Sequence, residues 1–387
     1  MNELMKTTPL YFDYQSTTPC LDKVVDAMVP YWSEFWGNPS SRQNRLGLHA
    51  SAAISLARDK LGSLLQVSPQ RLIFTSGATE ANNLALLGYS RAKAQETGST
   101  GHLITISTEH RSVIEPLRQL RREGFRVTEL TPNVDGIISL DGLSKSFEDD
   151  TFLVSVMLAN NEIGVLQPIK EIASLCKSRG VIFHSDASQG FGNLPIEIDK
   201  LQVDFLSISG HKIYGPKGIG LLVLGSNSIK IKPLQWGGDQ ENGIRAGTLP
   251  VPLVIGMAKA AEIAIEEIDL QVPRIRKLRD KLWQGLRDEI PELMLNGSFD
   301  KRLPNNLNFT VIGVNGSRLH KKLRPLISCS SGSACSNGSP SHVLMSLGRT
   351  INEAEASLRL SLGRATTLND VEMAIDIISN TVNYLRK

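Results

Sequence analysis

A lysine stands directly after an apolar strand in the segment Ser207-Ile208-Ser209-Gly210-His211-Lys212-Ile213-Tyr214-Gly215-Pro216-Lys217-Gly218. An amine on such a strand-end loop can condense with an aldehyde cofactor, while Ser209 and His211 are suited to donate hydrogen bonds to its phosphate. Alone, a Ser-x-x-Lys pattern is more often a surface lysine in a glycine-rich turn. Lys212 becomes a candidate Schiff-base lysine because four other segments supply the remaining contacts that such a cofactor needs.

Length and charge restrict the class of protein. The chain has 387 residues, more than one hydrophobic core normally supports, so we expect one large and one smaller domain. The formal net charge of +3 gives no general attraction to nucleic acid or to an anionic membrane. The first residues lack the apolar core of a secretory signal, and no apolar run approaches the roughly 20 residues of a membrane span. We therefore expect a cytoplasmic protein whose partners are small molecules and other proteins, with no direct role for nucleic acid or membrane.

The cysteines do not form a metal or disulfide pattern. Cys20, Cys176, Cys329 and Cys335 show neither CxxC nor zinc-type spacing, so we expect free thiols and no metal site. Cys176 falls on the apolar face of the helix predicted over Pro168–Arg179, which predicts a core position.

Short β-branched runs alternate with helical patterns through the first two thirds of the chain, which is typical of an α/β fold. The predicted strands, including a more irregular one at 126–130, are Arg71–Phe74, His102–Ile106, Arg126–Leu130, Phe152–Leu158, Val181–His184, Asp204–Ile208 and Ile219–Leu224. After Pro250, two long helical stretches over 251–269 and 272–290 lead into a part with strands near 293–295, 306–311 and 357–362 and helices near 317–323, 340–347 and 368–385. We predict a large domain over 15–255 and a small α+β domain made of 1–14 and 256–387.

Two further strand ends carry polar groups. The run Thr75–Glu80 connects a strand to a helix, so the backbone at Ala78 and the Thr79 hydroxyl are placed to bind a phosphate at a helix N-terminus. The same pattern also describes an ordinary helix cap. His110 follows another strand, where a flat imidazole could stack on a cofactor ring and shuttle protons, although a lone histidine is more often structural.

Two more segments complete the set. Asn161 follows the apolar strand over 152–158, at the sheet edge where α/β proteins bind ligands. Asp186 follows the strand near 181–184 and could pair with a heterocyclic nitrogen, and Gln189 could donate to a phenolic oxygen on the same ring. A ring partner, a stacking face, a phosphate cradle and an aldehyde-binding lysine together predict pyridoxal 5'-phosphate as the cofactor.

At this point the chain resembles the cysteine desulfurases, within the class V aminotransferase-like pyridoxal phosphate enzymes. The resemblance covers essentially the whole length, from Tyr11-Phe12-Asp13-Tyr14-Gln15-Ser16-Thr17-Thr18-Pro19 and Gly37-Asn38-Pro39-Ser40-Ser41 to Arg359-Leu360-Ser361-Leu362-Gly363-Arg364. It implies an α/β fold of the aminotransferase-like type (fold type I), with a seven-stranded, mostly parallel sheet in the large domain and a smaller α+β domain. It also implies a homodimer.

The resemblance assigns roles to matching positions. It implies Lys212 as the Schiff-base lysine, His110 as the stacking and proton-handling residue, Asp186 as the pyridinium partner and Gln189 as the phenolate partner. Ala78, Thr79, Ser209 and His211 would hold the phosphate, and Thr248 would reach in from the other subunit. Asn38, Asn161 and Arg359 would bind the substrate carboxylate, for which the bidentate arginine fork is apt.

A serine- and glycine-rich segment, about 326–340, carries the fourth cysteine. Its run Ser330-Ser331-Gly332-Ser333-Ala334-Cys335 is similar to the long catalytic loop of one desulfurase group. That similarity implies that Cys335 takes sulfur from L-cysteine as a persulfide, releases L-alanine and passes the sulfur to a protein acceptor, for iron–sulfur cluster assembly or other sulfur trafficking. Composition alone would predict a flexible linker with an incidental cysteine. Cys329 is expected to be a strand-end thiol, with a relay or redox role as the alternative.

Other functions on the same fold remain open from the sequence. They are a C–S or selenocysteine lyase that releases free sulfide or selenide, a transaminase, and a cofactor-binding scaffold without turnover. The chain also departs from the family pattern: Gly237-Gly238-Asp239-Gln240-Glu241-Asn242-Gly243 differs from the usual glycine-rich run, and the segment after Cys335 is about two residues shorter. Basic residues cluster over Arg318–Arg324, which favours a solvated helix face over a docking site for an acidic partner.

Overall fold

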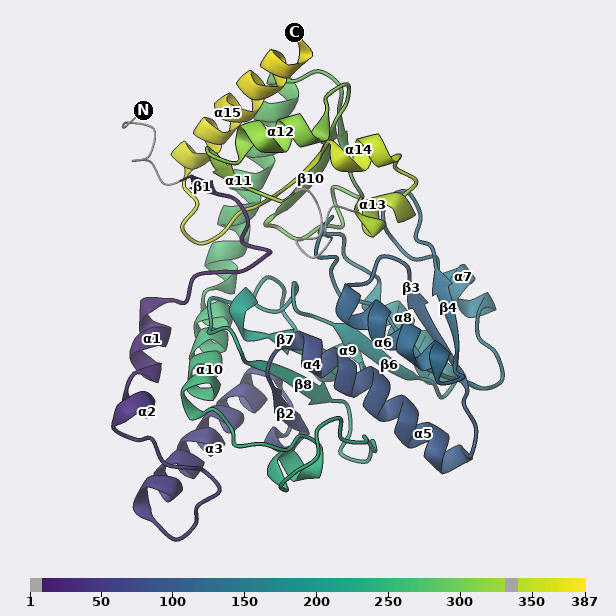
Figure 1. Ribbon diagram of the computed structural model, residues 1–387, viewed down its shortest axis with the longest axis vertical. Helices are drawn as coiled ribbons and strands as arrows, with labels where there is room; N and C mark the ends of the chain where they lie inside the picture. Colours follow the sequence, from purple (N-terminus) through teal and green to yellow (C-terminus); the bar gives the residue numbers. More distant parts are fainter. Residues whose placement is uncertain (1–8, 331–339) are drawn as a thin grey trace.

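The computed structural model describes residues 9–330 and 340–387. Figure 1 shows a large lower part built on one broad sheet and a smaller upper part that contains the C-terminal helix. The long helix α11 (Ile268–Glu289) extends from the lower part into the upper one. No helix among the described residues is both long and apolar enough to cross a membrane.

The large sheet confirms the predicted α/β fold. Its order is β2-β8-β7-β6-β5-β3-β4, and the strands are β2 (Leu72–Thr75), β3 (His102–Ile106), β4 (Arg126–Leu130), β5 (Thr151–Ser155), β6 (Ile182–Asp186), β7 (Phe205–Ser209) and β8 (Gly220–Leu224). Only β8 is antiparallel to its neighbours β2 and β7. The predicted strands agree with these to within a few residues, and the largest difference is at β5, which ends at Ser155.

Both faces of the sheet are covered, as a mostly parallel sheet requires. Successive residues alternate between faces: Ile104 and Val154 pack in the largest hydrophobic cluster, while their neighbours Leu103 and Leu153 pack in another. The largest cluster includes buried residues of α3 (Arg45–Leu65), α8 (Ile169–Ser178) and α10 (Val251–Glu266). The opposite face is covered by helical residues between 78 and 122, which include α4 (Ala78–Asn83), α5 (Tyr89–Thr97) and α6 (Arg111–Arg122). Cys176 is buried in the largest cluster, as predicted.

The upper part has its own sheet and core. Strands β9 (Leu293–Leu295), β10 (Asn306–Val311) and β12 (Ser357–Ser361) form an antiparallel sheet, and β1 (Leu10–Tyr11) pairs with β11 (Ile327–Ser328). A separate cluster joins Phe12, Trp283 and Phe309. The remaining helices are α1 (Asp22–Met28), α2 (Pro30–Ser33), α7 (Leu140–Lys145), α9 (Ile198–Leu201), α12 (Gly316–Leu323), α13 (His342–Ser346), α14 (Ile351–Glu355) and α15 (Leu368–Arg386).

These two cores support the proposed division into two domains but favour a different boundary. Buried residues of α10 as far as Ala264 pack in the large core, whereas Ile275 of α11 packs in the small one. The boundary proposed at 255/256 therefore cuts through α10. A boundary at Glu267, between the two helices, keeps each helix with the core that it covers.

Candidate active site

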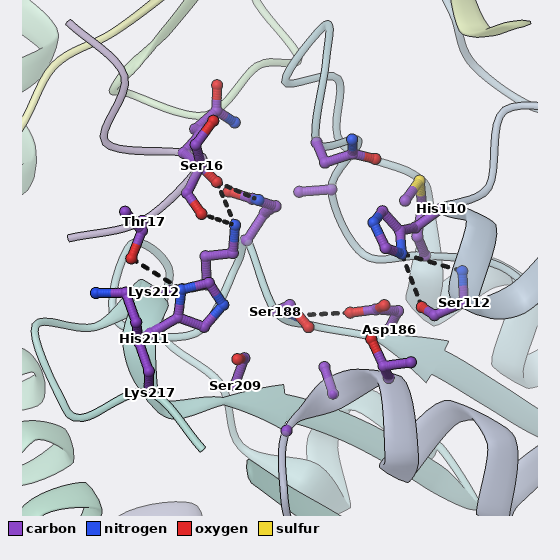
Figure 2. A pocket seen from close by; sticks show the side chains of 18 of the residues that line it. Ser16, Thr17, His110, Ser112, Asp186, Ser188, Ser209, His211, Lys212 and Lys217 are labelled. Carbon is purple, nitrogen blue, oxygen red and sulfur yellow. Dashed lines mark hydrogen bonds between the residues drawn. The ribbon is translucent and has the colours of Figure 1, made fainter. Parts of the chain in front are cut away.

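A cavity of about 570 Å³ opens at the carboxyl ends of β5, β6 and β7. This is the edge of an open α/β sheet at which ligands bind. Figure 2 shows Lys212, His211 and Ser16 on one side of the cavity and His110, Ser112 and Asp186 on the other. Of the predicted site residues, it is lined by Ala78, Thr79, His110, Asn161, Asp186, Gln189, Ser209, His211, Lys212 and Arg359.

Lys212 is held by the backbone of Gln15 and Ser16. It ends the 3-10 turn Gly210–Lys212 after β7, and its Nζ donates to the carbonyl oxygens of Gln15 and Ser16, the latter at 2.8 Å. Tyr214, two residues further on, has φ 65°, a left-handed conformation that costs a residue with a side chain roughly 1–2 kcal/mol. Its N–H donates to Thr18 Oγ1 at 2.8 Å. These bonds hold the turn in the conformation that directs Lys212 into the cavity.

Neutral donors and one unpredicted cation gather beside the lysine. Ser209 is the last residue of β7, Thr79 lies in the first turn of α4, and both line the cavity. Burial, together with the charges of Lys212 and Lys217, lowers the pKa of His211 to about 4, so the ring is neutral at pH 7 and can still donate one N–H. Lys217, which also lines the cavity, adds positive charge. This set of groups suits a phosphate.

Across the cavity, His110 and Asp186 are each held by hydrogen bonds. His110 is the N-cap of α6 and its Nδ1 accepts from the Ser112 N–H at 3.1 Å. Burial lowers the pKa of His110, opposed in part by Asp186, so the neutral ring is favoured. Asp186 ends β6, and its oxygens accept from the Ser188 N–H at 2.8 Å and from Asn82 Nδ2 at 2.7 Å. A carboxylate held in this way can still accept a hydrogen bond from a protonated ring nitrogen.

Arg359 reaches the cavity from β12 of the upper sheet. Its side chain is 3% exposed; Nη1 donates to the Asn161 carbonyl oxygen at 2.8 Å, and Nη2 donates to Asp13 Oδ1 at 2.8 Å and Ser16 Oγ at 2.7 Å. Its Nε, like Asn161 Oδ1, is buried and has no hydrogen-bond partner among the described residues. Buried polar atoms are rarely left unpaired. These two atoms therefore mark a place where a polar ligand would complete the site.

Gln15 was missed by the sequence reasoning, although it lies in a quoted motif. It is 2% exposed, lines the cavity, and accepts at Oε1 from Asn306 Nδ2 at 2.5 Å. Its Nε2 is another buried atom without a partner in the described part of the chain. The available signal was its position inside the Tyr11–Pro19 motif, which carries part of the resemblance to the family. Ser16, Ser112, Ser188 and Lys217 were likewise not predicted and also line the cavity.

Three predicted site residues do not line this cavity. Asn38 is exposed, and its Oδ1 accepts from the Ser40 N–H at 2.9 Å. Thr248 is also exposed and lines a separate open groove with Trp236 and Gly247. Cys335 lies outside the described residues, so its place relative to the cavity stays a prediction.

Both ends of the segment that carries Cys335 are attached beside the cavity. Ser330 pairs with the backbone of Arg359, with N···O distances of 3.2 and 2.7 Å. At the other end, Ser341 Oγ donates to Glu162 Oε2 and accepts from the Leu344 N–H at 3.1 Å. Glu162 is fully buried, and burial raises its pKa, while Ser341 and nearby cations oppose the rise. Since Glu162 adjoins Asn161, the residues that flank this segment lie next to two of the three predicted carboxylate-binding residues, Arg359 and Asn161.

Comparison with known proteins identifies the family. Residues 10–373 match the model of the aminotransferase class-V family. The chain belongs to the class V aminotransferase family. Among curated relatives, the cysteine desulfurase IscS of Edwardsiella ictaluri is 46% identical over 384 residues, covering 98% of this chain and 94% of that protein. The cysteine desulfurase IscS of Rickettsia akari is 43% identical over 384 residues, covering 98% and 93%. The predicted resemblance to the cysteine desulfurases is confirmed.

Solved structures of similar proteins have the same fold. A structure described as a NifS-like protein superposes with a TM-score of 0.91 at 34% identity and covers 98% of this chain and 100% of that chain. A structure described as SspA in complex with cysteine gives a TM-score of 0.80 at 36% identity and covers 92% and 99%. The predicted aminotransferase-like fold is therefore confirmed for this class V chain.

Proposed function

We propose that this protein is a cysteine desulfurase, which removes sulfur from L-cysteine with pyridoxal 5'-phosphate, gives L-alanine and leaves a persulfide on Cys335. The observation that carries the proposal is the convergence of Lys212, Asp186, His110 and Arg359 on one cavity in a chain that aligns over nearly its whole length with cysteine desulfurases.

The residues of the cavity fit the proposed cofactor. Thr79, Ser209 and His211 offer hydrogen-bond donors to a phosphate, and the Ala78 backbone lies beside them. The positive charge of Lys217 would offset the negative charge of the phosphate. Asp186 suits a ring nitrogen. Gln189 lines the same cavity, and its Nε2 donates at 3.1 Å to the Gln15 carbonyl oxygen that Lys212 Nζ also contacts, so Gln189 would be the donor to a phenolic oxygen beside the lysine. When bound there, the cofactor would take up the amine of an amino acid and supply an electron sink.

The chain's own residues divide the remaining work. Lys212 would hold the cofactor until substrate arrives and would then take the α-proton on Nζ, because two backbone carbonyls already hold the amine at the cavity wall. Asp186 would keep the facing nitrogen protonated, which makes proton removal from the substrate easier. Arg359 would donate to the α-carboxylate from Nε, its unpaired buried atom. Asn161 would donate to the same carboxylate from the N–H groups of its side-chain amide.

Sulfur transfer requires a second nucleophile. The Cys335 thiolate would attack the substrate sulfur, so that an S–S bond forms as the substrate C–S bond breaks. The electron pair of the broken bond stays on the substrate carbon, which takes up a proton and leaves as alanine. The persulfide sulfur would then pass to a protein acceptor. The attachment of Ser330 and Ser341 beside Arg359 and Glu162 supports a position for the segment near the substrate.

We further propose a homodimer in which Thr248 completes the partner's site. Thr248 is exposed beside Trp236, whose exposed fraction is 83%, and Asn38 lies near Trp36, exposed by 66%. Large exposed aromatic side chains favour a protein interface. Sedimentation should give twice the chain mass for the wild type, and Trp236→Arg should shift it toward monomer and weaken cofactor binding. A fully active monomeric wild type would contradict this assembly.

One experiment tests the activity against its alternatives. Purified protein with pyridoxal phosphate and L-cysteine, but no keto acid, should form alanine, and Lys212→Ala should not. Alanine formation that requires a keto acid would mean a transaminase. Free sulfide in step with alanine, unchanged in Cys335→Ala, would mean a lyase, and no alanine at all would leave only a scaffold. A cytoplasmic location stays a proposal from the sequence.

A further inference from the structure

We propose that Asn82 is a positioning residue that connects Asp186 to His110 and, through Ser112, holds the His110 ring in the tautomer protonated on Nε2. Asn82 does not line the cavity, but it bonds to Asp186 and Ser112, which do. The inference rests on the proposed function for what Asp186 and His110 contact during the reaction, but the bonds themselves lie within the protein.

The Asn82 side chain is wholly buried and oriented by its neighbours. It lies on α4 with no solvent exposure, and its Nδ2 donates to Asp186 Oδ2 at 2.7 Å and to Ser112 Oγ at 2.8 Å. An ionised carboxylate can only accept, so the nitrogen of the amide has to face Asp186. Its Oδ1 has no partner among the described residues. The orientation of the amide therefore satisfies its two N–H groups, whereas its oxygen has no partner among the described residues.

The direction of these bonds determines the state of His110. Because Ser112 Oγ accepts from Asn82, its own hydrogen is available to His110 Nδ1, which lies 2.7 Å away. The Ser112 backbone N–H, which can only donate, also contacts Nδ1 at 3.1 Å. Nδ1 thus accepts from both donors, and in the neutral ring the proton is on Nε2.

This arrangement separates the roles of the two groups that can move protons. A neutral ring with a proton on Nε2 can donate a hydrogen bond toward a ligand. A second proton would have to bind Nδ1, where it would break the hydrogen bonds from the Ser112 hydroxyl and N–H. Lys212 on the opposite wall is then the group that accepts the substrate proton. At the other end of this series of hydrogen bonds, Asn82 Nδ2 donates to one Asp186 oxygen and the Ser188 N–H donates to the other, which fixes the orientation of the carboxylate.

The bonds can be observed directly by NMR of the holoenzyme labelled with ¹⁵N-histidine. The His110 signal, one of seven histidines, is assigned by its loss in His110→Gln. In the wild type, Nε2 should carry the proton and Nδ1 should not. The surrounding charged or titratable groups are Asp186, Lys212, His342, Arg111 and Glu109, and they are the same in every variant below.

Two variants cut the chain of bonds at different points. Asn82→Leu replaces the amide by a side chain of similar size that donates to neither Asp186 nor Ser112. Ser112→Ala removes only the hydroxyl group and carries little risk to folding. Each should raise the pKa of His110 and increase the share of the Nδ1-protonated tautomer, which the Ser112 backbone N–H still disfavours. Asn82→Leu should also lower kcat about tenfold, with KM for L-cysteine within about twofold. Asn83 is the next residue on the same helix, and the control Asn83→Ala should leave the His110 pKa, the His110 tautomer and kcat unchanged. If the chain of bonds is continuous, the double variant shifts the His110 pKa no further than the larger single shift.

A wild-type His110 protonated on Nδ1 would overturn the inference, as would an unchanged tautomer and kcat in Asn82→Leu. If Asn82→Leu does not fold, an unchanged His110 pKa in Ser112→Ala overturns it as well. These results are distinct from a failure of the proposed function, which would appear as a wild type that forms no alanine whatever the tautomer of His110.

Discussion

Replacement of Arg359 by lysine tests whether this side chain binds the substrate carboxylate. Lysine keeps the positive charge but cannot donate to the Asn161 carbonyl, Asp13 and Ser16 together with a ligand, as the guanidinium is placed to do. The decisive atom is Nε, which is buried and has no partner in the described part of the chain. Loss of one charge-assisted hydrogen bond from that atom costs about 1.5–3 kcal/mol. Since about 1.4 kcal/mol corresponds to a tenfold change, kcat/KM should fall roughly 10- to 100-fold.

The assay is the initial rate of alanine formation over a range of L-cysteine concentrations, with cofactor occupancy followed by absorbance. Most of the loss should appear in KM, because the α-carboxylate is bound in both the ground state and the transition state. Arg274→Lys is the matched control: Arg274 donates to the carbonyl oxygens of Thr366 and Arg364 but does not line the cavity. A kcat/KM for Arg359→Lys within twofold of the control would refute the assignment.

Three further variants test the surroundings of the site. Ser341→Ala removes the N-cap of α13, worth about 1 kcal/mol, and the hydrogen bond to the buried Glu162 carboxyl, worth about 1–3 kcal/mol. The free energy of unfolding measured in urea should therefore fall by about 2–4 kcal/mol. A fall as small as that of the control Ser346→Ala would contradict the Ser341–Glu162 hydrogen bond. Burial raises the pKa of Glu109 well above its ordinary 4.5, so its stabilising contribution is present below pH 4.5 and is lost as pH rises through the raised pKa. The free energy of unfolding of Glu109→Gln should therefore rise relative to that of the wild type as the pH increases from 4.5 to 8. A difference between the two proteins that is independent of pH would contradict the raised pKa of Glu109. Burial raises the pKa of Cys329 to about 12, so Cys329→Ser should keep the rate of alanine formation and the wild-type thiol should resist iodoacetamide at pH 7; rapid labelling would favour a redox or relay role.

The strands were predictable because each is a short apolar run between turns, but their order was not. Pairing of β2 with β8 joins residues far apart in the chain, and its antiparallel direction follows from packing that no local pattern records. The helix α3 received no prediction although it is long. Its buried face includes Ala50, Ala53 and Ala57, small residues that give a weak hydrophobic signal yet allow close packing against the alanine-rich α10.

In the site, the residues with reactive groups at strand ends were predictable, whereas the residues that orient them were not. Lys212, Asp186 and His110 carry the chemistry in their side chains and follow recognisable strands. Asn82 and Gln15 acquire their places only through hydrogen bonds between distant elements, such as the 2.7 Å contact of Asn82 with Asp186. Asn82 does lie three positions after Thr79 on the same helix, a spacing that predicts a shared helix face, and that was the available signal.

The central claim is that sulfur from L-cysteine becomes bound to Cys335. The most direct test is mass spectrometry of the peptide that contains Cys335, after the holoenzyme is incubated with L-cysteine without reductant and quenched by alkylation. The proposed function predicts the added mass of one sulfur atom on Cys335, in proportion to the alanine formed and absent in Lys212→Ala. Alanine formed in full amount with an unmodified Cys335 would contradict it.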